Sequence, residues 1–121
     1  MIFVFAWSRF GVGITPEMYK YKVKRYVDTQ AYSDKKKDVL YAAIENIQSP
    51  EDISDYKKIF ISKAEWLEGK CWLIGADGTD QEVEVSADDW HVVIGDTGLH
   101  RYYNAIIDKE TLEYLGNVPI A

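Results

Sequence analysis

Few residues in this chain have the types and spacing that chemistry needs. A nucleophilic site would have to combine Cys71 with His91 or His100, because a thiol reacts only when a base contacts it or its pKa is lowered. Cys71 falls inside an expected strand, with no helix N-terminus predicted beside it to lower its pKa. We therefore expect an inert, buried thiol, no catalytic residue and no enzyme.

Metal and cofactor sites are not predicted either. A zinc site takes three or four Cys or His ligands at fitting spacings, and the chain has one Cys and two His. Residues 77–82 look like part of a calcium loop, but such a loop needs acidic or amide ligands at its first, third and fifth positions and glycine at its sixth, and Thr79 is neither acidic nor an amide. Gly11-Val-Gly13 lacks the further glycine or lysine of a phosphate-binding loop.

Carboxylates are plentiful, in pairs such as Glu82 with Glu84 and Asp88 with Asp89. Acid–base catalysis needs one carboxyl group in an apolar environment, so that the two pKa values separate. We expect all four of these side chains to be exposed. They are therefore candidates for binding and not for proton transfer.

The net charge of −6 is unevenly distributed along the 121 residues. Residues 1–63 carry eleven Lys and Arg against eight Asp and Glu, a balance of +3, whereas residues 64–121 carry three against twelve, a balance of −9. An acidic surface repels nucleic acid and attracts a basic protein surface. The charge therefore favours a protein partner.

Composition and length predict an ordinary globular domain spanning residues 1–121, with 47% hydrophobic and 28% charged residues. A lone cysteine offers no internal disulfide. The apolar segment of residues 1–7 is too short for a signal peptide or a membrane span, and we interpret it as a buried strand. These features predict a cytoplasmic protein without a membrane partner.

Two helices are predicted in the first half. Thr15-Pro16-Glu17 is typical of a helix start, with Thr15 as N-cap and proline at the first helical position. Residues 16–30 fit either helix or strand, because residues 19–24 alternate tyrosine or valine with lysine; the start signal favours a helix. Residues 34–48 form the clearer helix, capped by Ser33. A helical turn is expected in residues 50–56, and Ser62 to Glu65 match a capping box.

The second half predicts an antiparallel meander. Strands are expected at residues 57–62, 70–74, 81–86, 90–95, 99–107 and 112–115, separated by turn-forming residues. With Asp96-Thr97-Gly98 as a three-residue hairpin loop, Ile94 should face His100 and Val92 should face Tyr102. The fold class is therefore α+β, with an N-terminal strand and helices packed on a curved, mainly antiparallel sheet of four to six strands.

The segment from Trp90 to Gly116 resembles a known family. Trp90-His-Val-Val-Ile-Gly95, followed by Tyr103-Asn-Ala-Ile-Ile-Asp108-Lys-Glu-Thr-Leu-Glu-Tyr-Leu115-Gly116, is similar to the closing strands of PepSY-type and NTF2-like immunity domains. The resemblance implies helices on a curved antiparallel sheet. It also implies one of two roles, an immunity partner that neutralises a toxin or a domain with a ligand pocket.

The leading hypothesis is a small acidic inhibitor of the immunity type, which binds a toxin or another effector protein with a basic surface. Carboxylates would steer the encounter and Trp90 or Tyr103 would anchor it. The predicted partner-binding residues are Asp77, Asp80, Glu82, Glu84, Asp88, Asp89, Trp90, Asp96 and Tyr103.

Two other functions stay open. An NTF2-like domain would bind or transform a small apolar ligand between the helix of residues 34–48 and the sheet. A nucleic-acid-associated regulator would use the tyrosines and lysines of residues 20–37 for stacking and phosphate contacts. An edge strand formed by residues 112–115 or 1–7 would offer a surface for a homodimer.

Overall fold

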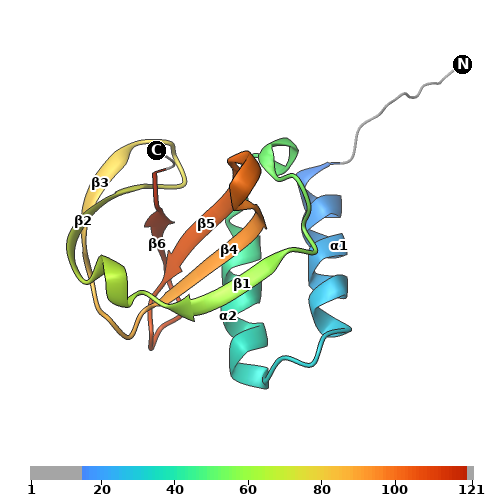
Figure 1. Ribbon diagram of the computed structural model, residues 1–121, viewed down its shortest axis with the longest axis horizontal. Coiled ribbons are helices and arrows are strands. Elements are labelled where there is room, and N and C mark those ends of the chain that lie inside the picture. The colour runs from blue at the N-terminus through green and yellow to red at the C-terminus, as the bar shows by residue number, and fades with distance from the viewer. Residues whose placement is uncertain (1–14, 120–121) are drawn as a thin grey trace, which may run out of the picture.

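The computed structural model describes residues 15–119. It contains two helices and a six-stranded antiparallel sheet, which confirms the α+β prediction (Figure 1). The predicted strand of residues 1–7 lies outside the described residues. None of the described helices is long and apolar enough to cross a membrane.

Both helices begin where their capping residues predict. Helix α1 spans Pro16–Asp28, and the Thr15 hydroxyl accepts a hydrogen bond of 3.1 Å from the Met18 N–H. Helix α2 spans Asp34–Glu45, and the Ser33 hydroxyl accepts one of 3.3 Å from the Lys36 N–H. Each cap satisfies a backbone donor that has no partner inside its helix. Residues 19–24 are therefore helical, despite their alternating pattern.

Helix α2 ends three residues before its predicted end. Asn46 is the C-cap, and its side-chain amide donates to the Ala42 carbonyl at 2.9 Å. This hydrogen bond satisfies a carbonyl group of the last helical turn. The helix therefore ends ahead of Pro50, which could not continue it. Pro50–Asp52 then forms the single turn η2 that was expected in this region.

The six strands are arranged in the order β1-β4-β5-β6-β2-β3. Their bounds are β1 Ile59–Lys63, β2 Gly69–Ile74, β3 Asp80–Val85, β4 Trp90–Asp96, β5 Arg101–Ile107 and β6 Tyr114–Asn117. The sheet edges are therefore β1 and β3. The predicted meander is wrong for the β2–β3 hairpin, because β3 does not pair with β4 and β2 pairs with β6 instead. The expectation that residues 112–115 form an edge strand is wrong, because β6 pairs with β5 on one side and β2 on the other.

The predicted capping box at Ser62 is also wrong. Ser62 belongs to β1, and the short turn η3 (Glu65–Leu67) begins after Ala64 with no side-chain cap. The sheet decides this segment, since Ser62 pairs with His91 of β4. A ladder of strand hydrogen bonds outweighs one local capping bond.

The β4–β5 hairpin has a longer loop than predicted. Thr97–Leu99 form the turn η4 and His100 adopts a left-handed backbone with φ of 55°. Ile94 therefore faces Tyr103, not His100, and Val92 faces Ala105, not Tyr102. The shift is an odd number of residues, so it exchanges the two faces of β5 relative to the prediction.

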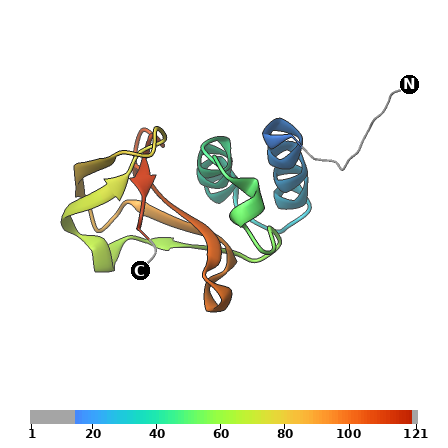
Figure 2. The same cartoon turned by 90° about the horizontal axis from the view of Figure 1, so that it is seen from above.

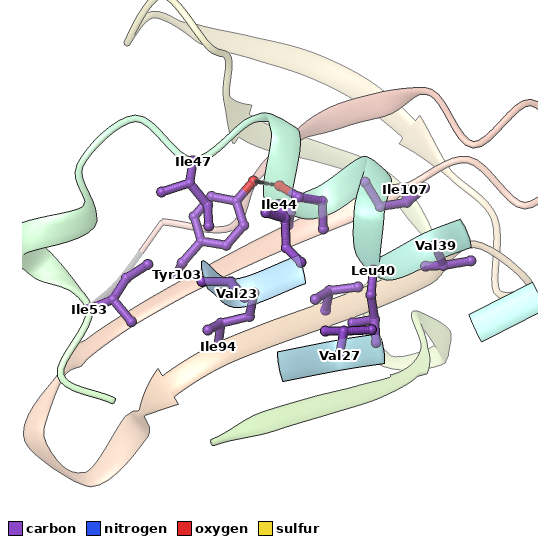
Figure 3. Packing of buried hydrophobic residues seen from close by; sticks show 13 residues of the cluster. Val23, Val27, Val39, Leu40, Ile44, Ile47, Ile53, Ile94, Tyr103 and Ile107 are labelled. Carbon is purple, nitrogen blue, oxygen red and sulfur yellow. Dashed lines mark hydrogen bonds between the residues drawn. The ribbon is translucent and has the colours of Figure 1, made fainter. Parts of the chain in front are cut away.

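The main core lies between the helices and one face of β4 and β5. Figure 2 shows both helices on one side of the sheet, and Figure 3 shows side chains of α1, α2 and β5 meeting there. The prediction that Val92 and Ile94 face the core is confirmed, as both are fully buried. The buried members of this cluster are Val23, Val27, Val39, Leu40, Ala43, Ile44, Ile47, Ile53, Val92, Ile94, Tyr103, Ala105 and Ile107.

A second, smaller core lies on the opposite face of β5. Ile106 points away from the helices and packs with Leu73 of β2, Val85 of β3 and Ala64. The curvature of the sheet brings the β2–β3 hairpin to this position. Gly116 permits the approach, because a Cβ atom there would lie 2.7 Å from Leu73 Cβ.

Gly95 offers a test of the hairpin geometry. Its φ is +122°, and an added Cβ would lie 2.6 Å from the Arg101 carbonyl oxygen; Gly69 has a similar φ of +114° but open space around it. We expect Gly69→Ala to lower the free energy of unfolding by about 1–2 kcal/mol through backbone strain alone. Gly95→Ala should cost clearly more, since it adds the steric clash.

Urea denaturation followed by circular dichroism measures both variants. Equal losses of stability in the two variants would contradict the packing described at Gly95.

Candidate functional site

The β2–β3 hairpin has one apolar and one polar face. Cys71 and Leu73 of β2 point inward with Val83 and Val85 of β3, and these four side chains form part of the second core or pack against it. The predicted alternation of β3, with the two glutamates outward and the two valines inward, is confirmed. The outward face therefore carries the residues that remain for binding.

Trp72 lies at the centre of that outward face. Its side chain is 63% exposed, and the strand register places it directly opposite Glu82, with Lys70 opposite Glu84. Asp80 points to the same side, because it pairs with Ile74, two residues beyond Trp72. We define the hairpin face as the side chains of Lys70, Trp72, Asp80, Glu82 and Glu84.

Asp77 lies in the turn that joins the two strands. Its carboxylate accepts hydrogen bonds from the Thr79 hydroxyl at 2.7 Å and from the Thr79 backbone N–H at 3.0 Å. These hydrogen bonds hold the pKa of Asp77 below its ordinary value, with the hydroxyl bond contributing most. Asp77 is therefore a charged, exposed group at the tip of the hairpin.

Asp88 and Asp89 have different environments. Asp88 is exposed, but Asp89 is only 2% exposed, so the expectation that all four paired carboxylates are exposed is wrong for Asp89. Its two carboxylate oxygens accept hydrogen bonds from the N–H groups of Ser86 at 2.8 Å and Lys109 at 2.9 Å. Asp89 joins the β3–β4 turn to the β5–β6 turn, which is a structural role.

The two aromatic anchors suggested by the sequence are largely covered. Tyr103 is 8% exposed, and its hydroxyl donates to the Ala43 carbonyl of α2 at 2.7 Å (Figure 3). Burial raises the pKa of this phenol far above its usual range. Trp90 packs against the main core, and Lys63 Nζ lies 3.7 Å from the centre of its ring. Neither ring is free to insert into a partner.

Trp72 is not among the binding residues predicted from the sequence, although the sequence around it carries a signal. Successive side chains of a strand point to opposite faces. If Cys71 and Leu73 face the core, Trp72 between them must face the solvent. The uninterrupted apolar run from Cys71 to Ile74 hid this, since such a run is equally typical of a strand buried on both faces.

Asp96 is engaged in local contacts at the end of β4. Lys58 Nζ lies 3.0 Å from one carboxylate oxygen, and the Gly98 N–H donates to the other at 2.9 Å. The Lys58 contact is the main cause of the lowered pKa of Asp96. This carboxylate shapes the β4–β5 loop and does not belong to the hairpin face.

The histidines and the cysteine form no common site. His100 lies in the exposed β4–β5 loop, while His91 lies in β4 with its ring centre 5.3 Å from that of Trp66. Cys71 Sγ donates to the Leu67 carbonyl at 2.9 Å. Within residues 15–119 no three His, Cys, Asp or Glu side chains are grouped as metal ligands.

The basic region of residues 20–37 is partly neutralised. Lys24 forms an ion pair with Glu45, and Lys20 Nζ donates to the Glu45 carbonyl at 2.8 Å. Tyr19 and Tyr26 pack edge-on against Tyr56, with ring centres 6.0 and 5.9 Å apart. These tyrosines are tied to the protein interior, which weakens the case for base stacking along this face.

The space beneath α2 is filled, so the predicted apolar pocket between this helix and the sheet is not there. Leu40, Ile44, Ile94 and Ile107 occupy it with no exposed surface. A cleft of about 390 Å³ lies instead beyond the C-terminal end of α2, toward the β2–β3 turn. Its lining is mixed polar and aromatic, not purely apolar.

Comparison with protein-family models, with curated proteins and with solved structures finds no match to this chain. The likeness of residues 90–116 to PepSY-type and NTF2-like immunity domains therefore stays a prediction.

Substitutions of Asp89 and Asp88 form a matched pair, because Asp89 has a structural role and Asp88 is exposed. Asp89→Ala leaves two backbone N–H groups without their acceptor, and each such loss costs about 1–3 kcal/mol. Asp88→Ala should change the free energy of unfolding by less than about 0.5 kcal/mol. Chemical denaturation of both variants measures the difference, and a tolerated Asp89→Ala would refute the assignment.

His91 should make stability depend on pH. Burial lowers its pKa below the ordinary 6.5, so below about pH 6.5 the unfolded chain binds a proton that the folded chain does not. Stability should be greatest above that pH and fall as the pH decreases through it. The urea concentration at the midpoint of unfolding, measured at several pH values between 7.5 and 5.5, should show this fall. Most carboxylates titrate below this range, so they contribute little to the change.

The matched variants are His91→Gln and His100→Asn, because His100 lies in the exposed loop and asparagine tolerates its left-handed backbone. His91→Gln should flatten the pH dependence and His100→Asn should leave it unchanged. The same slope in both variants would exclude His91 as the cause.

Proposed function

We propose that this protein is a small acidic inhibitor of the immunity type, which binds a basic effector or toxin through the hairpin face and masks it. The observation that carries the proposal is the exposed Trp72 ring, placed opposite Glu82 and among further carboxylates. Tryptophan is enriched among the residues that contribute most to protein–protein binding. An exposed tryptophan on a rigid strand supports an anchoring role.

The charge around Trp72 indicates the kind of partner. Lys70 is the one basic residue in residues 64–89. The acidic residues of that segment are Glu65, Glu68, Asp77, Asp80, Glu82, Glu84, Asp88 and Asp89. Such a concentration accelerates encounter with a basic surface and repels acidic ones. Nucleic acid is disfavoured by the same field, since phosphate contacts dominate its binding.

The hairpin face is also held in place before binding. Leu73 and Val85 are buried directly behind it, and the Gly116 backbone lies close against Leu73. A face that is already ordered loses little conformational entropy on association. The partner-binding residues of this proposal are therefore Trp72, Asp77, Asp80, Glu82, Glu84 and Asp88, without the covered Asp89, Trp90 and Tyr103.

The remaining features of the proposal come from the sequence. The resemblance of residues 90–116 to immunity domains supports an inhibitory role beside a toxin, in the cytoplasm, and makes the product of the adjacent gene the first partner to test. The acidic edge strand β3 disfavours self-pairing, because like charges on an edge oppose strand addition. Any homodimer would therefore use the β1 edge, which bears the exposed Phe60.

The proposal is tested by capturing partners from the source cell on the immobilised protein and then measuring affinity for each identified partner. Trp72→Ala should weaken binding by about 30-fold, the effect of a typical anchoring residue. Phe60→Ala is the matched control, because Phe60 has a similar exposure on another strand. Inhibition of the partner's effector activity should then require about 30-fold more Trp72→Ala than wild-type protein.

Charge reversal tests the electrostatic part. Glu82→Lys with Glu84→Lys should slow association at low salt, with a smaller effect at high salt. Glu17→Lys with Asp38→Lys makes the same change in net charge on the exposed surface of the helices. Equal association rates for the two double variants would overturn the assignment of the hairpin face.

A further inference from the structure

The cleft beyond α2 is separate from the hairpin face. It has a volume of about 390 Å³, within the common range for small-molecule sites. Segments far apart in the sequence form its walls: the end of α2 with η2, the β2–β3 turn, and strands β5 and β6. Figure 1 shows β5 and β6 between the β2–β3 hairpin and α2.

The charge of the lining disfavours anionic ligands. The described residues around the cleft include no lysine, arginine or histidine, and Asp52 is the single charged side chain among them. Arg101 lies nearby, but it is not part of the lining and its guanidinium donates to the Glu51 carbonyl at 3.1 Å. A phosphate or carboxylate would find no cation in the cleft and would be repelled by Asp52.

The carboxamides of the lining offer both a donor and an acceptor. Asn104 is 4% exposed, and its side-chain oxygen accepts from the Val118 N–H at 2.8 Å. Asn104 is one of the residues that line the cleft, and its amide Nδ2 donates no hydrogen bond within residues 15–119. Asn46 is oriented in the reverse sense: its amide donates to the Ala42 carbonyl, which leaves its Oδ1 to accept.

Tyrosines supply the apolar part of the lining. Tyr102 and Tyr114 are half-buried, and Tyr114 is held in position because its hydroxyl donates to the Asn117 side-chain oxygen and lies 3.4 Å from the Ile74 carbonyl oxygen. Aromatic rings present flat apolar surface beside a polar edge. A purely apolar ligand would cover the Asn104 amide without giving it a hydrogen-bond partner, which carries a free-energy cost.

We propose that this cleft binds a neutral, polyhydroxylated ligand, of the chemical class of a sugar ring, either free or at the end of a glycan. Each hydroxyl group donates and accepts, so it can pair with the Asn104 amide, the Asn46 oxygen and the Asp52 carboxylate. The C–H faces of the ring pack on Tyr102 and Tyr114. The absence of any cation around the described lining distinguishes this ligand from a sugar phosphate.

The experiment is a titration of the ¹⁵N-labelled full chain, followed by amide chemical shifts. The probes are the methyl glycosides of glucose, galactose, mannose and N-acetylglucosamine, with glucose 6-phosphate as the anionic counterpart and adenine as a neutral ligand of another class. Chitobiose and maltose are the disaccharides of N-acetylglucosamine and glucose, and they represent the end of a glycan. At least one neutral saccharide should cause saturable shifts at Gly75, Gly78, Asn104 and Asn117.

A blocking variant connects the shifts to the cleft. Ala76 is exposed at the border of the cleft, so Ala76→Trp should fill the opening and weaken binding at least about tenfold. Ala31→Trp introduces the same side chain on the exposed α1–α2 loop and should bind like the wild type. Thermal denaturation establishes that both variants fold.

Stronger binding of a disaccharide than of the methyl glycoside of its constituent monosaccharide would identify the end of a glycan as the ligand. Equal binding of the two would identify a free sugar. Three results would overturn the proposal: no saturable shift with any saccharide, binding of adenine or glucose 6-phosphate alone, or shifts that Ala76→Trp leaves unchanged.

Discussion

The whole structure depends on burying β5 from both sides. Tyr103, Ala105 and Ile107 pack in the main core with the helices, Ile106 packs in the second core, and the buried Asn104 lines the cleft. Because β5 is covered on both faces, the sheet must curve so that the β2–β3 hairpin can reach Ile106. The Tyr103 hydroxyl then connects β5 to the backbone of α2 through a buried hydrogen bond. Such a bond orients the helix as well as stabilising it, since an unpaired buried hydroxyl is costly.

The two surfaces of functional interest follow from that curvature. The hairpin that covers Ile106 with its apolar side turns Trp72 and the glutamates to solvent on its other side. Its tip also approaches the C-terminal end of α2 and closes one wall of the cleft. One hairpin therefore shapes both surfaces, although they have different chemistry. The outward face is acidic with a central aromatic ring, and the cleft is neutral apart from Asp52.

Asp89 shows how the fold changes the meaning of a residue. In the sequence it is one more carboxylate in an acidic half. In the structure it is buried and accepts two backbone hydrogen bonds, which connect two turns that are 20 residues apart in the chain. A buried carboxylate satisfied in this way organises the backbone, whereas its exposed neighbour Asp88 remains available to a partner. Adjacent residues of identical type thus have opposite roles, because only one points inward.

The sequence by itself determined the features that arise within a few residues. Thr15 and Ser33 cap their helices, β3 alternates between solvent and core, and Val92 and Ile94 face inward, because propensity and periodicity act locally. The acidic balance of the second half, on which the proposal of a basic partner rests, also follows from the residues alone.

Only the tertiary structure decided the β4–β5 register, the internal place of β6, the burial of Tyr103 and Asp89, and the exposure of Trp72. Each depends on contacts between segments far apart in the chain. The left-handed backbone of His100 lengthens the β4–β5 loop and so shifts the register. The curvature of the sheet turns the apolar side of the β2–β3 hairpin toward the second core, which leaves Trp72 on the outer side. Local patterns carry no information on such contacts, since the same alternation fits either pairing until the core is assembled.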